Sequence, residues 1–162
     1  MIRIEAGRRQ LWQGFELNIR EPITFREDGI YRLHGPNGSG KSSFIQRILI
    51  PTIIDRRDFY IICVEQQLHL QLIALKAQAA IFKPGFKIDS ESDLWRYLWD
   101  NLSEQPDEFP VCVIADEAHS VEIPQGLARP IYVIYSSHHY NLDNSQDIHF
   151  EPINIHESLV YV

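Results

Sequence analysis

The chain has few cysteines and no long apolar run. Its two cysteines, Cys63 and Cys112, each lie inside a short apolar stretch, which argues against a disulfide framework or a cysteine-based metal site and indicates reduced, buried core residues. No run approaches the ~18 apolar residues that a membrane span needs. The first ten residues also lack the apolar stretch of a signal peptide. We therefore expect a cytoplasmic protein without direct membrane insertion, whose association with a membrane would need a partner.

The chain also lacks an excess of basic residues. Fifteen Lys and Arg stand against 22 Asp and Glu, so the net charge is −7. Domains that bind duplex nucleic acid usually present a basic surface, and nucleic acid is therefore not an expected partner. Apolar residues make up 44% and charged residues 23%, the profile of a globular domain. Without repeats, linkers or low-complexity tracts, residues 1–162 are expected to form a single domain.

Expected strands and helices alternate along the chain. Strands are expected over residues 2–5, 14–19, 30–34, 59–64, 111–115 and 131–135, with one or two more between 147 and 162. Helices are expected over 41–49, with Pro51 as the stop, over 68–82, and over 94–102 after a cap at Ser90. The runs 111–115 and 131–135 are almost wholly apolar, which is typical of strands covered on both faces. This order predicts an α/β fold with a ligand site beyond the carboxyl ends of the strands.

A glycine-rich segment follows the strand expected at 30–34. Its residues are Gly35, Pro36, Asn37, Gly38, Ser39, Gly40, Lys41, Ser42 and Ser43. They fit the phosphate-binding loop G-x-x-x-x-G-K-S, here in its proper place between a strand and a helix. Glycines leave room for phosphate oxygens, and successive N–H groups with the helix N-terminus surround the anion. Lys41 is expected to contact the β- and γ-phosphates and Ser42 to coordinate Mg²⁺, so the segment predicts binding of a nucleoside triphosphate, ATP or a close relative, with Mg²⁺.

Two acids follow the apolar run at 111–115. A carboxylate at the tip of a buried strand beside a phosphate loop suits contact with Mg²⁺, direct or through water, and Asp116 is the candidate. The adjacent Glu117 is the candidate catalytic base, which accepts a proton from the attacking water. The pair therefore predicts hydrolysis as well as binding of the nucleotide.

The loop spelling Gly-Pro-Asn-Gly-Ser-Gly-Lys-Ser resembles that of ABC-type ATPases, as does the pair of strands expected before it. The resemblance implies an α/β P-loop NTPase fold, RecA-like, with a mostly parallel central sheet flanked by helices and an N-terminal antiparallel β element. It implies that Trp12 stacks on adenine. It also implies that Gln66, with Gln67 as the alternative, contacts Mg²⁺ and the attacking water. His138, with His139 as the alternative, would contact the γ-phosphate.

The chain departs from this family in the segment that should carry the signature Leu-Ser-Gly-Gly-Gln. Residues 88–93 stand there, lack both glycines and contain acids that would repel a facing γ-phosphate. Only 49 residues separate Gln66 from Asp116, which predicts a reduced helical subdomain, and Ala118 replaces the usual proline. We therefore expect an ATPase that is weak alone or depends on a homodimeric, heterodimeric or membrane-protein partner.

Two other interpretations stay open. The chain could be a nucleotide-dependent switch without significant hydrolysis. Alternatively, residues 116–119 spell the DEAH motif of a helicase family, with Ser136 and Ser137 as a loose third motif. A helicase needs a second domain of similar size, and the acidic balance disfavours a groove for a single strand. The sequence distinguishes neither ATP from GTP nor a transport role from other roles.

Overall fold

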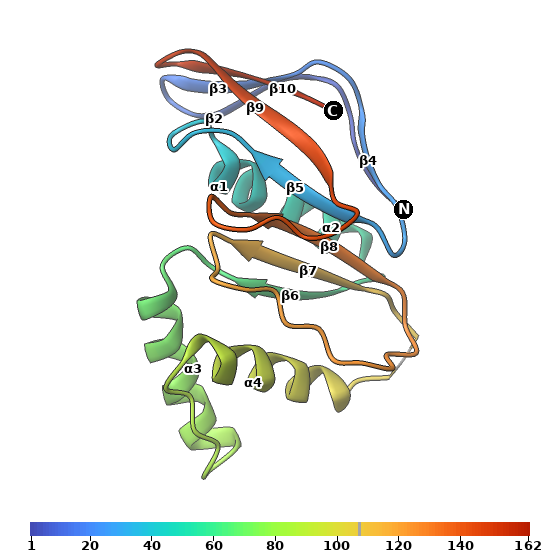
Figure 1. The fold of residues 1–162 in the computed structure, drawn as a ribbon, viewed down its shortest axis with the longest axis vertical. Coiled ribbons are helices and arrows are strands. Elements are labelled where there is room, and N and C mark those ends of the chain that lie inside the picture. Colours follow the sequence, from blue (N-terminus) through green and yellow to red (C-terminus); the bar gives the residue numbers. More distant parts are fainter. Residues whose placement is uncertain (107) are drawn as a thin grey trace.

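An eight-stranded sheet in the order β2-β3-β10-β9-β5-β8-β7-β6 runs through the computed structural model, which describes residues 1–106 and 108–162 (Figure 1). Its strands are β2 (Gly7–Trp12), β3 (Phe15–Ile19), β5 (Ile30–His34), β6 (Tyr60–Val64), β7 (Val111–Asp116), β8 (Ile131–Ser136), β9 (Gln146–Asn154) and β10 (Glu157–Tyr161). Strands β1 (Ile2–Ile4) and β4 (Ile23–Phe25) form a separate antiparallel pair. The helices are α1 (Lys41–Phe44), the π-helical η1 (Ile45–Leu49), α2 (Ile50–Arg56), α3 (Leu68–Phe82) and α4 (Glu91–Ser103).

The central strands are parallel, as predicted. Strand β8 pairs in parallel with both β5 and β7, and β7 pairs in parallel with β6. Strand β9 is also parallel to β5, whereas the pairs β9–β10 and β2–β3 are antiparallel. The carboxyl ends of β5, β6, β7 and β8 therefore meet at one edge of the sheet, where the polar residues that follow each strand are brought together.

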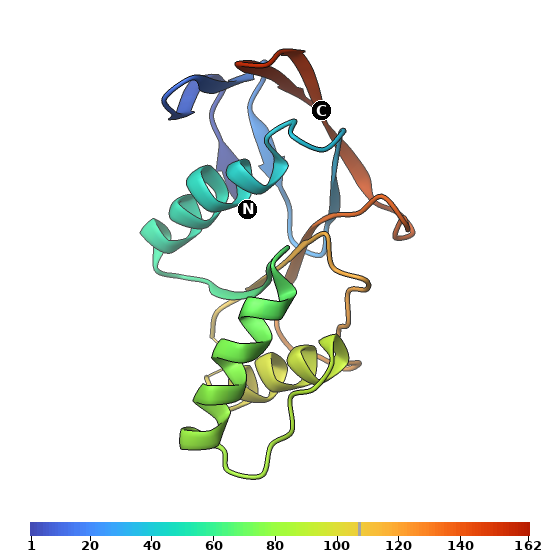
Figure 2. The same ribbon diagram turned by 90° about the vertical axis from the view of Figure 1, so that its left-hand side faces the viewer.

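Helices cover both faces of the central strands. Because side chains alternate along a strand, Cys112 and Ile114 of β7 join a core with the helix that begins at α1, while Val113 and Ala115 join a second core with α4. Figure 2 shows the helical segments on different sides of the sheet. Every residue of β7 is buried, as its apolar run predicted. No helix in the described residues is long and apolar enough to cross a membrane.

The helix that begins at Lys41 does not stop at Pro51, and that prediction was wrong. It continues to Arg56 because residues 45–49 form π-helical turns, which shift the hydrogen-bond ladder just before the proline. Pro51 then lies in the first turn of α2, where its missing N–H is tolerated. The helix ends instead at Arg57, which has a φ of 60°.

Other differences from prediction are local. Strands β2 and β4 were not expected, and Cys63 is only partly buried, although burial raises the pKa of its thiol to about 12. The predicted cap of α4 is present, since the Ser90 hydroxyl accepts a hydrogen bond from the N–H of Asp93. Among the residues described between β6 and β7, the helices are α3 and α4, in keeping with the predicted reduction of the helical subdomain.

Candidate functional site

The segment after β5 has the geometry of a phosphate-binding loop. Gly38 and Gly40 have φ values of 78° and 99°, which L side chains rarely adopt. A Cβ on Gly40 would also lie 2.9 Å from Leu17 and 3.0 Å from Phe15. At Gly35 a Cβ would lie 2.4 Å from the carbonyl oxygen of Phe150. Glycine is therefore required here by both conformation and space.

Lys41 lies inside the curve of this loop. Its ammonium donates hydrogen bonds to the carbonyl oxygens of Gly35, at 2.5 Å, and of Pro36, at 3.0 Å. Burial lowers the pKa of Lys41, and the nearby charges of Glu117 and Asp116 oppose that shift. The carboxylates thus favour the charged ammonium at the place where phosphate oxygens would add further negative charge.

A cavity of about 340 Å³ lies beside the phosphate loop and is lined by Ser42, Gln66 and Asp116. The Ser42 hydroxyl donates to the side-chain oxygen of Gln66 at 3.3 Å. Asp116 is buried and accepts a hydrogen bond from Ser136 at 2.9 Å, which leaves its second oxygen available. A hydroxyl, an amide oxygen and a carboxylate are hard oxygen donors of the kind that Mg²⁺ prefers, so these residues fit that ion.

Glu117, the second acid of the pair, lines a second cavity beside the phosphate loop. It has a φ of 54°, and its backbone N–H donates to both the carbonyl and the hydroxyl of Ser136. Its Oε1 is buried without a hydrogen-bond partner and lies 3.4 Å from Nε2 of His138. The same Nε2 is 2.9 Å from Oδ1 of Asn37, so His138 links the acid to the phosphate loop.

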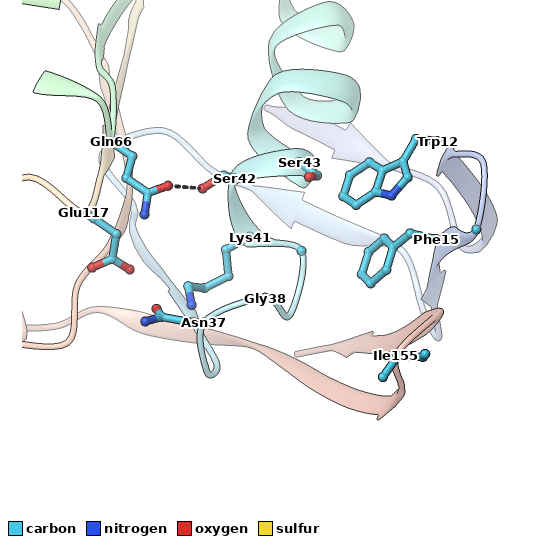
Figure 3. A pocket seen from close by; sticks show the side chains of 12 residues that line it. Trp12, Phe15, Asn37, Gly38, Lys41, Ser42, Ser43, Gln66, Glu117 and Ile155 are labelled. Atoms are coloured by element: carbon cyan, nitrogen blue, oxygen red, sulfur yellow. Dashed lines mark hydrogen bonds between the residues drawn. The ribbon is translucent and has the colours of Figure 1, made fainter. Parts of the chain in front are cut away.

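One cavity of about 360 Å³ unites most of these groups (Figure 3). Asn37, Lys41, Ser42, Gln66 and Glu117 all line it, although they come from three different strand ends. In Figure 3 the Lys41 side chain extends toward Asn37, on the side where Glu117 lies. The predicted site residues after β5, β6 and β7 are thus brought together by the parallel order of those strands. Neither His138 nor its alternative His139 lines this cavity, and Gln67 lines the cavity beside Asp116 instead, together with Gln66.

The far wall of the same cavity is apolar and lies beside Trp12. The Trp12 ring stacks on Phe15, with centroids 4.8 Å apart and planes 14° apart, and Ile155 completes the wall. His156, next to Ile155, contacts the Gly14 carbonyl through Nδ1 at 2.8 Å, which ties the two turns together. Phe15 and Ile155 were missed in the sequence. An exposed isoleucine between Asn154 and His156, at the tip of a hairpin, is the signal that could have found one of them.

His119, the last residue of the DEAH-like sequence, lies away from this cavity. His119 is 85% exposed in its side chain, and its ring Nδ1 and backbone N–H both contact the Glu91 carboxylate at the start of α4. Glu91 belongs to the segment that replaces the family signature. The end of the DEAH-like sequence is therefore held by α4, outside the residues that line the nucleotide-sized cavity.

Comparison with known families agrees with this geometry. Residues 24–148 match the model of the family described as AAA domain, so the chain belongs to that family and is a P-loop NTPase domain. The matched segment contains the phosphate loop and the paired acids, but neither Trp12 nor Ile155. No curated protein and no solved structure matches the chain.

Proposed function

We propose that this chain is an ABC-type ATPase domain that binds ATP with Mg²⁺ and hydrolyses it weakly, or strongly only with a partner. The observation that carries the proposal is the convergence of Lys41, Ser42, Gln66 and Glu117 on one cavity with an aromatic wall. A triphosphate in the loop would reach Lys41, and its base would reach Trp12. This combination supports a nucleotide as the ligand, because inorganic phosphate has no apolar part that could contact the apolar wall.

The residues around the phosphate loop have the chemistry for hydrolysis. The unpaired oxygen of Glu117 is an acceptor for the proton of an attacking water, and His138 and Gln66 would orient that water and the γ-phosphate. Bound Mg²⁺ would neutralise charge on the β- and γ-phosphates and would be held by Ser42, Gln66 and Asp116. Lys41 would stabilise the charge that develops during transfer.

The proposed dependence on a partner follows from the signature segment. Residues 88–93 contain three acids, and all three are engaged within the chain. Asp89 pairs with Lys76 and Asp93 with Arg96, while Glu91 contacts His119. An acidic surface facing a γ-phosphate of another site would repel it, so this segment is unsuited to complete a second active site. We therefore expect a low rate for the purified chain.

Phosphate release by purified variants tests the proposal. Glu117→Gln should lower turnover at least about tenfold, since general-base catalysis contributes about 10²–10⁴-fold, while leaving Mg²⁺-ATP binding intact. The matched control is Glu27→Gln, an exposed glutamate outside the cavity. Equal rates above background for Glu117→Gln and the parent would mean that Glu117 has no catalytic role. Lys41→Ala should abolish binding, and retained binding would refute the site itself.

A further inference from the structure

The carboxylate of Glu91 accepts several hydrogen bonds from the loop that follows β7. Glu91 is the first residue of α4, and its side chain is only 10% exposed. One of its oxygens accepts from the backbone N–H groups of His119, at 3.0 Å, and of Ser120, at 3.3 Å. The other oxygen lies 2.7 Å from the ring Nδ1 of His119. Burying a carboxylate costs free energy unless it is hydrogen-bonded, so Glu91 and the loop hold each other in place.

Glu91 is itself held firmly by α4. The hydroxyl of Ser90 already caps the helix by accepting from the N–H of Asp93, so the oxygens of Glu91 are available to residues outside the helix. Leu94 and Trp95, in the next turn, are fully buried and anchor this end of α4 in the core. The indole N–H of Trp95 also donates to Glu91 at 3.4 Å. The carboxylate therefore has a fixed position from which it can orient the loop.

The loop that Glu91 holds begins with the candidate catalytic base. Glu117 precedes His119 by two residues and has a φ of 54°, which a non-glycine residue keeps only when its surroundings enforce it. On one side, Ser136 accepts the N–H of Glu117 through both its carbonyl and its hydroxyl. On the other side, Glu91 holds the two residues of the loop that it contacts. The backbone at Glu117 is thus fixed from β8 and from α4 at once.

Glu91 also lies near Glu117 in space, since both carboxylates act on Tyr140. The Tyr140 hydroxyl is buried and has no hydrogen-bond partner among the described residues. Burial raises the pKa of Tyr140 to about 12, and the charges of Glu91, Tyr135 and Glu117 add to that rise. Glu91 therefore has two ways to act on Glu117, through its hydrogen bonds to the loop and through its charge.

We propose that Glu91 is a positioning residue, whose hydrogen bonds to the loop after β7 hold the Glu117 carboxylate toward the phosphate loop. The inference rests on the proposed function, because it gives Glu91 a part in hydrolysis by Glu117. It also gives residues 88–93, which replace the family signature, a role within their own chain. Hydrogen bonds carry the effect, since the ring of His119 is 85% exposed and water screens its charge contact with Glu91.

Four variants at two positions separate geometry from charge. Glu91→Ala removes the hydrogen bonds and should lower kcat about 10- to 100-fold, because a small displacement of a catalytic group costs that much. Glu91→Asp keeps the charge but draws the oxygens away from the loop, so it should lose nearly as much. Glu91→Gln removes the charge but keeps an oxygen that can accept the same N–H groups, and should retain most of the rate. The control is Asp89→Ala, an acid of the same segment that pairs with Lys76 and should behave like the parent.

Phosphate release at a range of Mg²⁺-ATP concentrations measures these effects. The KM should stay near that of the parent, because Lys41 and the phosphate loop are unchanged. In the Glu117→Gln background, Glu91→Ala should lower kcat by less than about twofold, since it acts through the residue already removed. A parental kcat in Glu91→Ala, or a full further loss in the Glu117→Gln background, would overturn the proposal. Retained rate in Glu91→Asp with loss in Glu91→Gln would assign the effect to charge and refute positioning by hydrogen bonds.

Amide hydrogen exchange shows whether the loop is held, independently of turnover. Peptides that cover residues 117–121 should exchange faster in Glu91→Ala than in the parent or in Asp89→Ala. Peptides from β7 should exchange as in the parent, which excludes a general folding defect. Unchanged exchange at residues 117–121 in an active parent and its variants would refute this role alone. A parent without turnover would refute the proposed hydrolysis and this role with it, so the two failures are distinguishable.

Discussion

Replacing Trp12 with alanine should separate binding of the base from binding of the phosphates. Trp12 is 46% exposed and lines the cavity at the end away from Glu117 (Figure 3). Stacking of a base on an aromatic ring is worth about 1–3 kcal/mol, which corresponds to about 5- to 150-fold in Kd. One face of the indole already packs on Phe15, so the loss should lie in the lower part of that range, about tenfold.

Isothermal titration calorimetry with two ligands measures this effect. Mg²⁺-ATP has both a base and a phosphate tail, whereas inorganic tripolyphosphate has the tail alone. We expect Trp12→Ala to weaken ATP binding about tenfold and to leave tripolyphosphate binding unchanged. Trp12→Phe, which keeps an aromatic ring, should lose less than Trp12→Ala. Because the side chain is half exposed, the thermal stability of the variant should stay close to that of the parent.

Two results would refute this reasoning. An equal loss for both ligands would mean that Trp12 supports the phosphate loop through Phe15 rather than contacting a base. No loss for either ligand would place the base elsewhere, away from the apolar wall. In either case the phosphate loop would stand as the nucleotide site, but the aromatic wall would lose its assigned role.

Three further predictions concern folding. Gly35→Ala should destabilise the fold by about 1–3 kcal/mol because its Cβ would meet a backbone oxygen of β9 at 2.4 Å, and a fall in melting temperature measures this. Ser90→Ala should cost about 1 kcal/mol in urea unfolding through loss of the α4 cap, whereas Ser90→Asp should retain it. Hydrogen bonds from Arg32 lower the pKa of Asp147, so the native state binds fewer protons and stability should fall as pH drops below about 5. Asp147→Asn should flatten that acid dependence, and an unchanged slope would contradict the assignment.

Local sequence predicted those parts of the fold that depend on neighbouring residues. The limits of β5 and α3, the cap at Ser90 and the glycines of the phosphate loop follow from short-range patterns. Helix α2 was missed because the π-helical turns that accommodate Pro51 are not visible in the residue types alone. Strand β2 was missed because its residues are mostly polar and only pairing with β3 makes them a strand.

The sequence by itself determined the chemistry of the site. The loop from Gly35 to Ser43, the acids after β7 and the polar residues after β6 and β8 are all local motifs, and they specify which groups are available. Only the tertiary structure decided which groups meet. The parallel order β5-β8-β7-β6 brings their ends to one edge, and the pairing of β3 with β10 places Ile155 beside Phe15, 140 residues away in the chain. Such contacts depend on strand order and register, which no local pattern encodes.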